Sequence, residues 1–419
     1  MSTDTMLKHG FKRFKALLTP AVIVAALGYF VDIYDLLLFS IVRKPSLESL
    51  GFSGSELTQT GLFLHNTQMF GMLLGGILWG VLGDKRGRLS VLFGSIALYS
   101  VANIANAFVH SAESYAFFRF FAGLGLAGEL GAGITLVSEV LPKHLRGYGT
   151  MVVATVGVSG AIVAGIIGEY FSWRTNYAIG GALGIALLFL RIGVSESGLF
   201  HDAKKDQSVS RGNFLSLFSS KSNRRGRFFA CILSGVPIWY VIGILMQLSP
   251  EYGKAFQIST PLTSGRAIVF CYSGLVLGDF MSGFLSQVFK TRIQIVRVFL
   301  LGILLSTILF FTLNWHGSSV MYYLICFMLG LFSGYWAVFV TIAAEQFGTN
   351  LRSTVATIAP NFVRGMVVPM NLMFAFIQGQ SSIIHAAISV GTVALLIAFL
   401  SAYKLKDTFG IELNYLENI

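Results

Sequence analysis

The chain has 419 residues, of which 54% are hydrophobic and only 12% are charged, and its formal net charge is +11. Soluble domains carry about 25% charged residues, so this composition excludes an ordinary soluble globule. The apolar residues also arrive in uninterrupted runs of about 20, the length that crosses a bilayer as a helix, which excludes a large soluble core. The Lys and Arg residues occupy short segments between these runs, so nucleic acid is not expected as a partner.

Taken in chain order, the apolar runs predict an all-α polytopic membrane protein with twelve transmembrane helices. The first run follows a basic N-terminal segment. It is too long for a signal-peptide core and lacks a small-residue cleavage site, so we expect it to be retained as the first helix. The expected helices span residues 18–42, 58–83, 89–109, 114–140, 147–169, 174–193, 227–249, 264–288, 293–314, 319–344, 352–378 and 382–403.

The connection at residues 194–226 is longer and more polar than the others, and it divides the runs six and six. We therefore expect two six-helix bundles, residues 1–193 and 227–419, joined by this linker. Two parallel six-helix repeats are a plan of secondary transporters, whose substrate site lies between the halves near the middle of the membrane.

A trace of internal repetition supports two related halves. The fourth run of each half contains a Gly and, at the same later offsets, a Glu and an Arg. These residues are Gly128, Glu139 and Arg146 in the first half and Gly334, Glu345 and Arg352 in the second. Both Glu–Arg pairs fall at the inner end of the fourth helix, and we take them as candidate gating residues.

The distribution of basic residues predicts the orientation. If the N-terminus is cytoplasmic, most Lys and Arg residues in the connections face the cytoplasm, as the positive-inside rule requires. Both termini and the 194–226 linker are then cytoplasmic, and the protein lies in the inner (plasma) membrane. The inner cations include Lys85, Arg86, Arg88, Lys143, Arg146, Lys290, Arg292, Lys404 and Lys406, against Arg43, Lys44, Arg174, Lys254 and Arg266 outside.

A motif between the second and third runs indicates a family. The chain reads Gly80-Val-Leu-Gly83-Asp84-Lys-Arg-Gly87-Arg88, which resembles the Gly-x-Leu-x-Asp-Arg/Lys-x-Gly-Arg loop of the major facilitator superfamily. Small residues allow close helix contact, and Asp84 is suited to a helix N-terminus or a neighbouring arginine. The resemblance implies a gating role for these residues. The alternative is a generic basic turn. The corresponding loop of the second half, residues 283–292, is degenerate and lacks the matching Asp.

The fourth and first runs narrow the resemblance. The glycine-rich stretch from Arg119 through Glu129, followed by Glu139-x-x-Pro-x-x-x-Arg146, is similar to the metabolite–proton symporter branch, which is related to the sugar porters. Asp32-Ile-Tyr-Asp35 occupies the place where that branch carries Glu-Trp-Tyr-Asp. The resemblance therefore implies proton-coupled transport of a small solute.

Ionisable residues at membrane depth are costly and usually face a cavity with a partner. Asp35 lies roughly 10 Å from the outer end of its helix and Arg119 about 8 Å from the outer start of its own, by helical rise. Their similar depths make a pair feasible. The related symporters place a protonatable Asp and an Arg at these positions, so we expect Asp35 and Arg119 to couple the proton. Asp32 and Glu129 are further candidates, and a permanent structural ion pair is the alternative.

Arg364 is expected about 18 Å into the eleventh run, near the midplane, one turn after Asn361 and between two prolines. Such a cation suggests an anionic substrate group, such as a carboxylate; the alternative is a structural cation paired with Asp32 or Glu129. Weaker candidates for substrate contact are polar and aromatic residues that could equally serve helix packing. They are His65, Gln68, Tyr240 and Trp336.

These observations favour a proton-coupled importer of an organic acid, amino acid or related metabolite that works by alternating access. The partners expected are the small-molecule substrate, protons and the lipid bilayer, with the protein acting as a monomer. No cofactor or metal is expected, because the chain lacks a Gly-x-x-x-x-Gly-Lys phosphate loop and its seven His residues are scattered. An exporter or uncoupled facilitator is the alternative. A non-transporting nutrient sensor and an enzyme are more remote.

Overall fold

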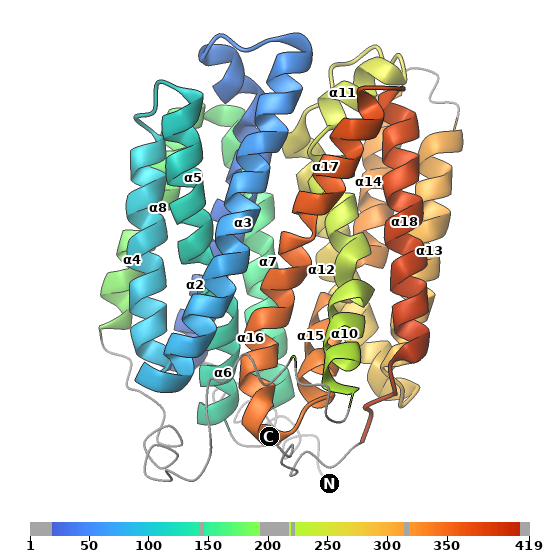
Figure 1. Ribbon diagram of the computed structural model, residues 1–419. Helices are drawn as coiled ribbons and strands as arrows, with labels where there is room; N and C mark the ends of the chain where they lie inside the picture. Colours follow the sequence, from blue (N-terminus) through green and yellow to red (C-terminus); the bar gives the residue numbers. More distant parts are fainter. Residues whose placement is uncertain (1–18, 142–145, 193–217, 219–222, 314–317, 411–419) are drawn as a thin grey trace, which may run out of the picture.

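The computed structural model describes residues 19–141, 146–192, 218, 223–313 and 318–410, without the side chains at 84, 88, 135, 138, 139, 146–148, 150, 151, 349, 350, 352 and 353. The described residues form helices that run between two ends of the molecule (Figure 1). We call the end at which Pro20 begins the first helix the lower end, and the opposite end the upper end, as drawn in Figure 1.

The N-terminal helices pack side by side on the left of Figure 1. Most breaks between them fall near the predicted ends of the apolar runs, whereas the break between α5 and α6 falls inside the run predicted at 114–140. They are α2 (Pro20–Ser49), α3 (Gly54–Arg86), α4 (Arg88–Asn106), α5 (Ala112–Leu126), α6 (Glu129–Val140), α7 (Arg146–Tyr170) and α8 (Trp173–Arg191).

The C-terminal helices form the right-hand side of the same figure. They are α10 (Arg224–Tyr240), the π-helical η3 (Val241–Met246), α11 (Ser249–Ala255), α12 (Ser264–Val288), α13 (Ile293–Thr312), α14 (Ser319–Ser333), α15 (Trp336–Glu345), α16 (Thr349–Gly365), α17 (Val367–Gln378) and α18 (Ile383–Lys404).

Each predicted apolar run coincides with one helix or with consecutive helices, so the all-α membrane fold is confirmed. Ten helical segments within the described residues are long and apolar enough to cross a bilayer. The helices α3 and α8 contain more polar positions, and they pack against α5 and α4, respectively. The division at residues 193 and 226 stays a prediction, because most of the linker lies outside the described residues.

Several runs are broken in the middle of the membrane, and the two halves share one break. The fourth run of the first half divides into α5 and α6 at Gly128, and the fourth run of the second half divides into α14 and α15 at Gly334. These are the two glycines that the internal repeat aligned. The eleventh run divides into α16 and α17 at Met366. Broken helices expose backbone groups at membrane depth, which is tolerated only inside protein.

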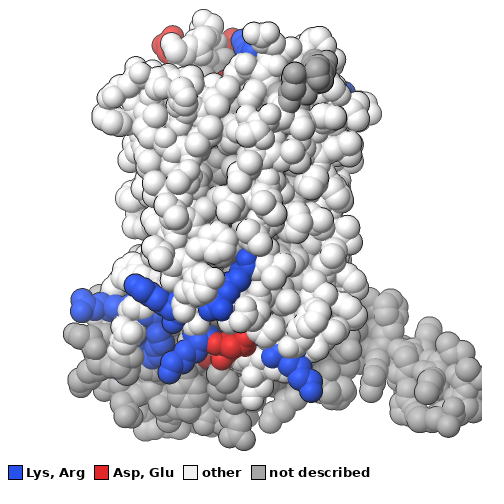
Figure 2. All heavy atoms as spheres, turned by 90° about the vertical axis from the view of Figure 1, so that its right-hand side faces the viewer, with Lys and Arg blue, Asp and Glu red and all other residues white. Residues whose placement is uncertain are grey.

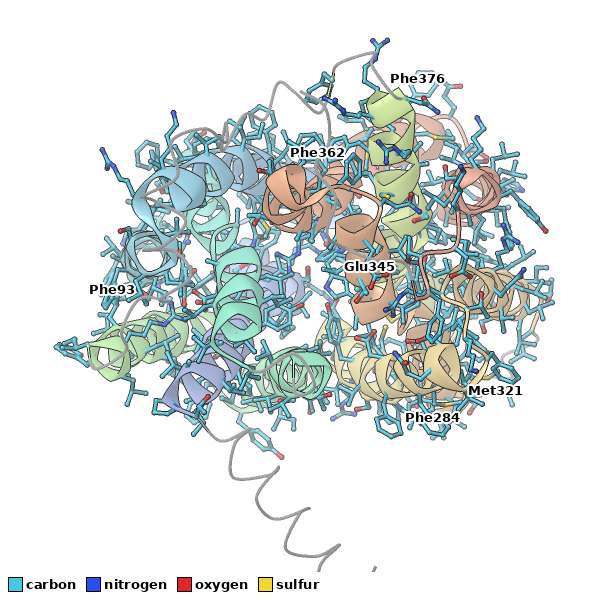
Figure 3. All side chains as sticks on the ribbon, turned by 90° about the horizontal axis from the view of Figure 1, so that it is seen from below. Phe93, Phe284, Met321, Glu345, Phe362 and Phe376 are labelled. Carbon is cyan, nitrogen blue, oxygen red and sulfur yellow. The ribbon has the colours of Figure 1, made fainter. Side chains whose placement is uncertain are left out.

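The sides of the molecule are apolar, and cations gather at the lower end. Large exposed side chains along the helices include Phe280, Phe284 and Leu305. In Figure 2 the Lys and Arg side chains form a cluster near the lower end, whereas the surface above is mostly uncharged. Seen from below, Phe284 and Phe376 point outward from the bundle (Figure 3). An apolar belt with a basic end is what a membrane-spanning chain presents to lipid and to the headgroups.

The two halves touch along α3 with α16 and along α7 with α12. Small residues on α3 and on α6 bring α16 close to the N-terminal half. A Cβ atom placed on Gly76 of α3 would lie 2.8 Å from the Cβ of Asn361, and one placed on Gly131 of α6 would lie 2.7 Å from Cγ2 of Thr357.

Candidate functional site

A buried charge pair joins the halves near the break in the eleventh run. The Arg364 Nη2 atom lies 3.7 Å from Oδ2 of Asp32, and both side chains are at most 1% exposed. One turn before Arg364, the Oδ1 atom of Asn361 accepts a long hydrogen bond of 3.5 Å from Nη1 of Arg364. Its amide donates a 2.9 Å hydrogen bond to the carbonyl of Ala127, at the break in the fourth run. Arg364 therefore contacts Asp32, which the sequence left open as one of two alternative partners.

Two indole rings from the C-terminal half flank Arg364. The guanidinium carbon lies 5.9 Å from the ring centroid of Trp239 on α10 and 5.8 Å from that of Trp336 on α15. Both distances are within the range of cation–π attraction. Trp336 was expected from the sequence to be near the site, whereas Trp239 was not. The guanidinium is thus held between aromatic faces, with one loose carboxylate contact and with Nε free of hydrogen bonds among the described residues.

Asp35 and Arg119 are both fully buried, but they do not form an ion pair among the described residues. Within the described part of the chain, neither oxygen of Asp35 accepts a hydrogen bond, and none of the three guanidinium nitrogens of Arg119 donates one. Arg119 instead lies 5.3 Å from the ring centroid of Phe39 and 5.7 Å from that of Tyr177. In this conformation, the predicted coupling pair is separated, and both members carry unsatisfied polar atoms.

Glu129 has a partner that sequence reasoning missed. Arg191, the last residue of α8, donates to both carboxylate oxygens of Glu129, one of them at 3.1 Å, and also to the carbonyl of Leu92 at 3.3 Å. Both side chains are fully buried. The signal in the sequence was a cation directly at the end of the sixth run. Glu129 is therefore held by two charge-assisted hydrogen bonds, unlike Asp35.

The weaker candidates occupy different places. His65 on α3 is 1% exposed, and its Nδ1 atom has no hydrogen-bond partner among the residues that the structure describes. Its Cε1 atom lies 3.5 Å from where a Cβ on Gly243 would be, so it faces the other half. Gln68 donates to the carbonyl of Leu36 at 3.3 Å. Tyr240 donates to the carbonyl of Ala387 at 3.0 Å, which matches the packing alternative weighed for it.

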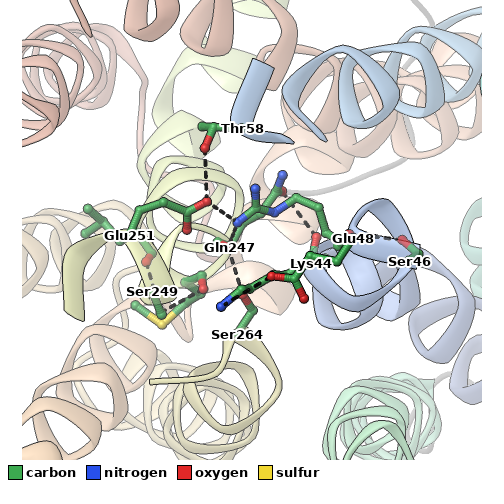
Figure 4. Close-up of polar contacts among 12 residues, drawn as sticks. Lys44, Ser46, Glu48, Thr58, Gln247, Ser249, Glu251 and Ser264 are labelled. Carbon is green, nitrogen blue, oxygen red and sulfur yellow. Dashed lines mark hydrogen bonds and ion pairs between the residues drawn. The ribbon is translucent and has the colours of Figure 1, made fainter. Parts of the chain in front are cut away.

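A polar network closes the upper end between the halves (Figure 4). Arg43 on α2 donates at 2.6 Å to Glu251 on α11 and at 3.3 Å to the backbone carbonyl of Gln247. Thr58 on α3 donates to the same Glu251 oxygen at 3.3 Å, and Ser40 donates to the side-chain oxygen of Gln247 at 3.2 Å. Arg43 was predicted only as an outer cation, so its pairing across the halves is a second feature that sequence reasoning missed.

The gating-motif residues are only partly described. Gly87 joins α3 to α4 with φ = 99°, a conformation that favours glycine. Gly80 and Gly83 lie within the last turns of α3. Glu345 forms a two-pronged ion pair with Arg292, the residue before α13, at 2.7 and 2.8 Å, and Figure 3 shows Glu345 on the lower face. The predicted roles of the remaining motif residues fall on side chains outside the described residues: Asp84, Arg88, Glu139, Arg146 and Arg352.

Within the described residues, no three His, Cys, Asp or Glu side chains converge as a metal site would require. The chemistry that the buried groups support is reversible ion pairing and proton exchange. The buried Asp32 and Asp35 can bind and release a proton, whereas the buried Arg119 and Arg364 stay protonated and can only pair with an anion.

Comparisons with known proteins agree with this architecture. The family model of the Major Facilitator Superfamily matches residues 25–368. The chain is 24% identical to the gentisate transporter of Corynebacterium glutamicum, covering 93% of this chain and 89% of that protein. It is 23% identical to the benzoate transport protein of Acinetobacter baylyi, covering 80% and 78%.

A solved structure shows the same fold. The xylose transporter XylE of E. coli, in an inward-open conformation, superposes with a TM-score of 0.71 over 94% of this chain and 97% of that one, at 17% sequence identity. The chain is thus a multi-pass membrane transporter and not an enzyme. It belongs to the major facilitator superfamily.

Proposed function

We propose that this protein imports a small organic anion together with a proton by alternating access between its two halves. The observation that carries the proposal is the environment of Arg364. This guanidinium is buried at the contact between the halves, flanked by Trp239 and Trp336, and held by a single carboxylate contact of 3.7 Å to Asp32. A substrate carboxylate can replace such a loose contact with two parallel hydrogen bonds.

The surroundings of Arg364 favour a carboxylate attached to a flat or apolar body. Indole rings offer stacking surface and exclude water, while the guanidinium supplies the charge complement. The two relatives described above are named for gentisate and benzoate, and both of these compounds are aromatic carboxylates. Organic acids of this kind therefore come first among the candidate substrates, with amino acids and related metabolites after them. We place Asn361, His65 and Gln68 as further contacts, since all three are buried and the first two lie against the opposite half.

The proposed proton carrier is Asp35, with Asp32 as the second candidate. Among the described residues, the buried side chains of Asp35 and Arg119 form no hydrogen bond and no ion pair with each other. A carboxylate that meets an arginine in one state and loses it in another holds its proton differently in the two states. Glu129 is the weaker candidate, because Arg191 already neutralises it.

The proposed orientation places the lower end in the cytoplasm and the chain in the inner membrane as a monomer. The concentration of Lys and Arg at that end supports this orientation. Labelling of a Ser208→Cys variant with an impermeant thiol reagent tests it on intact cells. Reaction from outside would reverse the proposed topology. Residue 208 itself lies outside the described residues.

The experiment that tests the function is uptake into proteoliposomes of radiolabelled benzoate, gentisate and a panel of other organic acids and amino acids. Each is measured with and without an inward proton gradient. Accumulation only with the gradient supports proton-coupled import. Equilibration without accumulation identifies an uncoupled facilitator, and expulsion in response to the same gradient identifies an exporter. Arg364→Ala should abolish uptake and Arg364→Lys should restore it poorly, because an ammonium cannot form the bidentate contact.

A further inference from the structure

Asp279 is a buried carboxylate of the C-terminal half that the proposed cycle does not use. It lies in α12 and is 8% exposed. Its Oδ1 atom accepts a 3.1 Å hydrogen bond from the backbone N–H of Ala337, and its Oδ2 atom is buried without a hydrogen-bond partner among the described residues. Burying a carboxylate at membrane depth costs free energy, so we expect Asp279 to have a structural or functional role.

The group that Asp279 contacts is the start of a helix. The tenth run stops at Ser333, passes through Gly334 and Tyr335, and resumes as α15 at Trp336. The first N–H groups of any helix lack intrahelical partners. The N-cap residue Tyr335 makes no side-chain capping hydrogen bond. Asp279 therefore supplies from a neighbouring helix the cap that α15 does not provide for itself, and its negative charge suits the helix dipole.

The backbone at the break between α14 and α15 is closely packed, so Asp279 caps a first turn of α15 whose position is fixed. A Cβ atom on Gly334 would lie 2.5 Å from both the Asp279 nitrogen and the Gly278 Cα, so only glycine allows α12 to approach this closely. On the other side, the hydroxyl of Tyr335 donates 2.8 Å to the carbonyl of Ser234 on α10. The first turn of α15 is therefore fixed between two helices.

Trp336 is the first residue of this turn, and its ring centroid lies 5.8 Å from the guanidinium carbon of Arg364. We propose that Asp279 is a positioning residue: by capping α15 it holds Trp336 against Arg364 and thereby sets the affinity for the organic anion. The effect on affinity rests on the proposed function of Arg364. The structural effect on α15 does not.

Two substitutions separate the cap from the charge. Asp279→Ala removes the acceptor for the Ala337 N–H, whereas Asp279→Asn keeps an oxygen acceptor and removes only the negative charge. Ser282→Ala is the matched control, because Ser282 is also buried in α12 and bonds only to the Asp279 backbone carbonyl in its own helix. The measurements are amide hydrogen exchange of residues 334–341 in purified protein and the KM and kcat for radiolabelled gentisate in proteoliposomes.

For Asp279→Ala we expect faster exchange at the start of α15 and a KM raised about fivefold to tenfold with kcat little changed, as loss of one cap implies. Asp279→Asn should rescue both readouts, and Ser282→Ala should resemble the wild type. Exchange and KM in Asp279→Ala that match those of Ser282→Ala would overturn the proposal. So would an Asp279→Asn variant that loses proton-driven uptake but keeps exchange, because Asp279 would then carry a proton. If the wild-type chain transports no acid, the proposed function fails, and amide exchange alone decides the capping role.

Discussion

Arg43 and Glu251 connect the two halves at the upper end through an ion pair of 2.6 Å, although they are 208 positions apart in the chain. Arg43 is fully buried and Glu251 is 19% exposed. In the proposed alternating-access cycle the upper end opens to admit substrate, so this pair would break and re-form in each turnover. The Arg43–Glu251 ion pair therefore contributes to the free energy that favours the closed upper end.

We expect Glu251→Gln to favour the open upper end, because the variant loses a hydrogen bond to a charged group. Such a bond contributes about 1.5–3 kcal/mol to the stability of the closed form. The contribution is smaller here, since Glu251 is partly exposed. A cysteine at Ser40, buried beside Gln247, should then react faster with a thiol reagent added from the upper side. Glu169→Gln is the control. Glu169 also pairs across the halves, with Arg266 at 2.6 Å, but both side chains are more exposed. Equal labelling rates in the two variants would contradict a gate at Arg43.

The second prediction concerns the glycine contact between α3 and α16. A methyl group on Gly76 would press on Asn361 at 2.8 Å, whereas one on Gly265, at another contact between the halves, would meet Ile41 at an ordinary 3.4 Å. Overpacking of this kind costs about 1–3 kcal/mol. Gly76→Ala should therefore slow initial uptake about tenfold, while Gly265→Ala should keep nearly the wild-type rate. If the two variants transport equally well at equal protein levels, the close contact does not limit the cycle.

For the proton, Asp35→Asn should eliminate accumulation driven by a pH gradient, because an amide neither binds nor releases a proton. Exchange of external for internal substrate should survive, since it needs no net proton movement. Asp32→Asn should show the milder loss of accumulation. Counterflow and gradient-driven uptake, measured on the same vesicles, separate these effects. Continued pH-driven accumulation by Asp35→Asn would transfer the coupling role to Asp32 or Glu129.

The fourth prediction concerns stability at the lower end, where Asp407 caps α13. It accepts hydrogen bonds from the backbone N–H groups of Arg292 and Ile293 and from the Thr291 hydroxyl. Partial burial raises the pKa of Asp407, but these hydrogen bonds outweigh it and hold the pKa below its ordinary 3.8. A lowered pKa in the folded state means that the stabilisation is present above the unfolded pKa and is lost as the pH falls through the folded pKa.

Asp407→Ala should thus lower the thermal midpoint at neutral pH, by an amount that corresponds to about 1 kcal/mol for one lost cap. The difference from the wild type should shrink as the pH falls below the ordinary carboxyl range. Thermal unfolding in detergent across that pH range measures both effects. A difference that stays constant down to strongly acidic pH would mean that Asp407 does not act as a charged cap.

The apolar runs were enough to predict where the helices lie, because length and hydropathy are local properties of the chain. They did not predict that the fourth helix of each half breaks: the runs at 114–140 and 319–344 were expected to be continuous, although the internal repeat had aligned Gly128 with Gly334, where the breaks occur. The end of α2 was less accurate. It continues to Ser49, past the predicted residue 42, because Arg43 and Ser46 are buried by packing against neighbouring helices and not by lipid.

Pairing of charges could not be predicted in the same way. The partners of Glu129 and of Arg43 lie 62 and 208 positions away, and nothing local in the sequence marks their approach. Asp279 was overlooked for a related reason: its partner is a backbone N–H exposed by a break in another helix. The sequence located the buried Arg364 and left Asp32 among its possible partners, but only the packed structure shows that the two meet.

The buried charges around Asp32 and Arg364 determine how the membrane voltage acts on transport. With Asp35 and Arg119, these residues form a group of two aspartates and two arginines, all of them buried, whose charges sum to zero. Binding one monovalent carboxylate and one proton, on either aspartate, leaves that sum at zero. The membrane voltage does work only on net charge that crosses, about 2.3 kcal/mol per charge per 100 mV. We therefore expect uptake of a monovalent acid to follow the pH difference and to ignore the voltage, whereas a divalent acid carried with one proton would be driven back by an interior-negative potential.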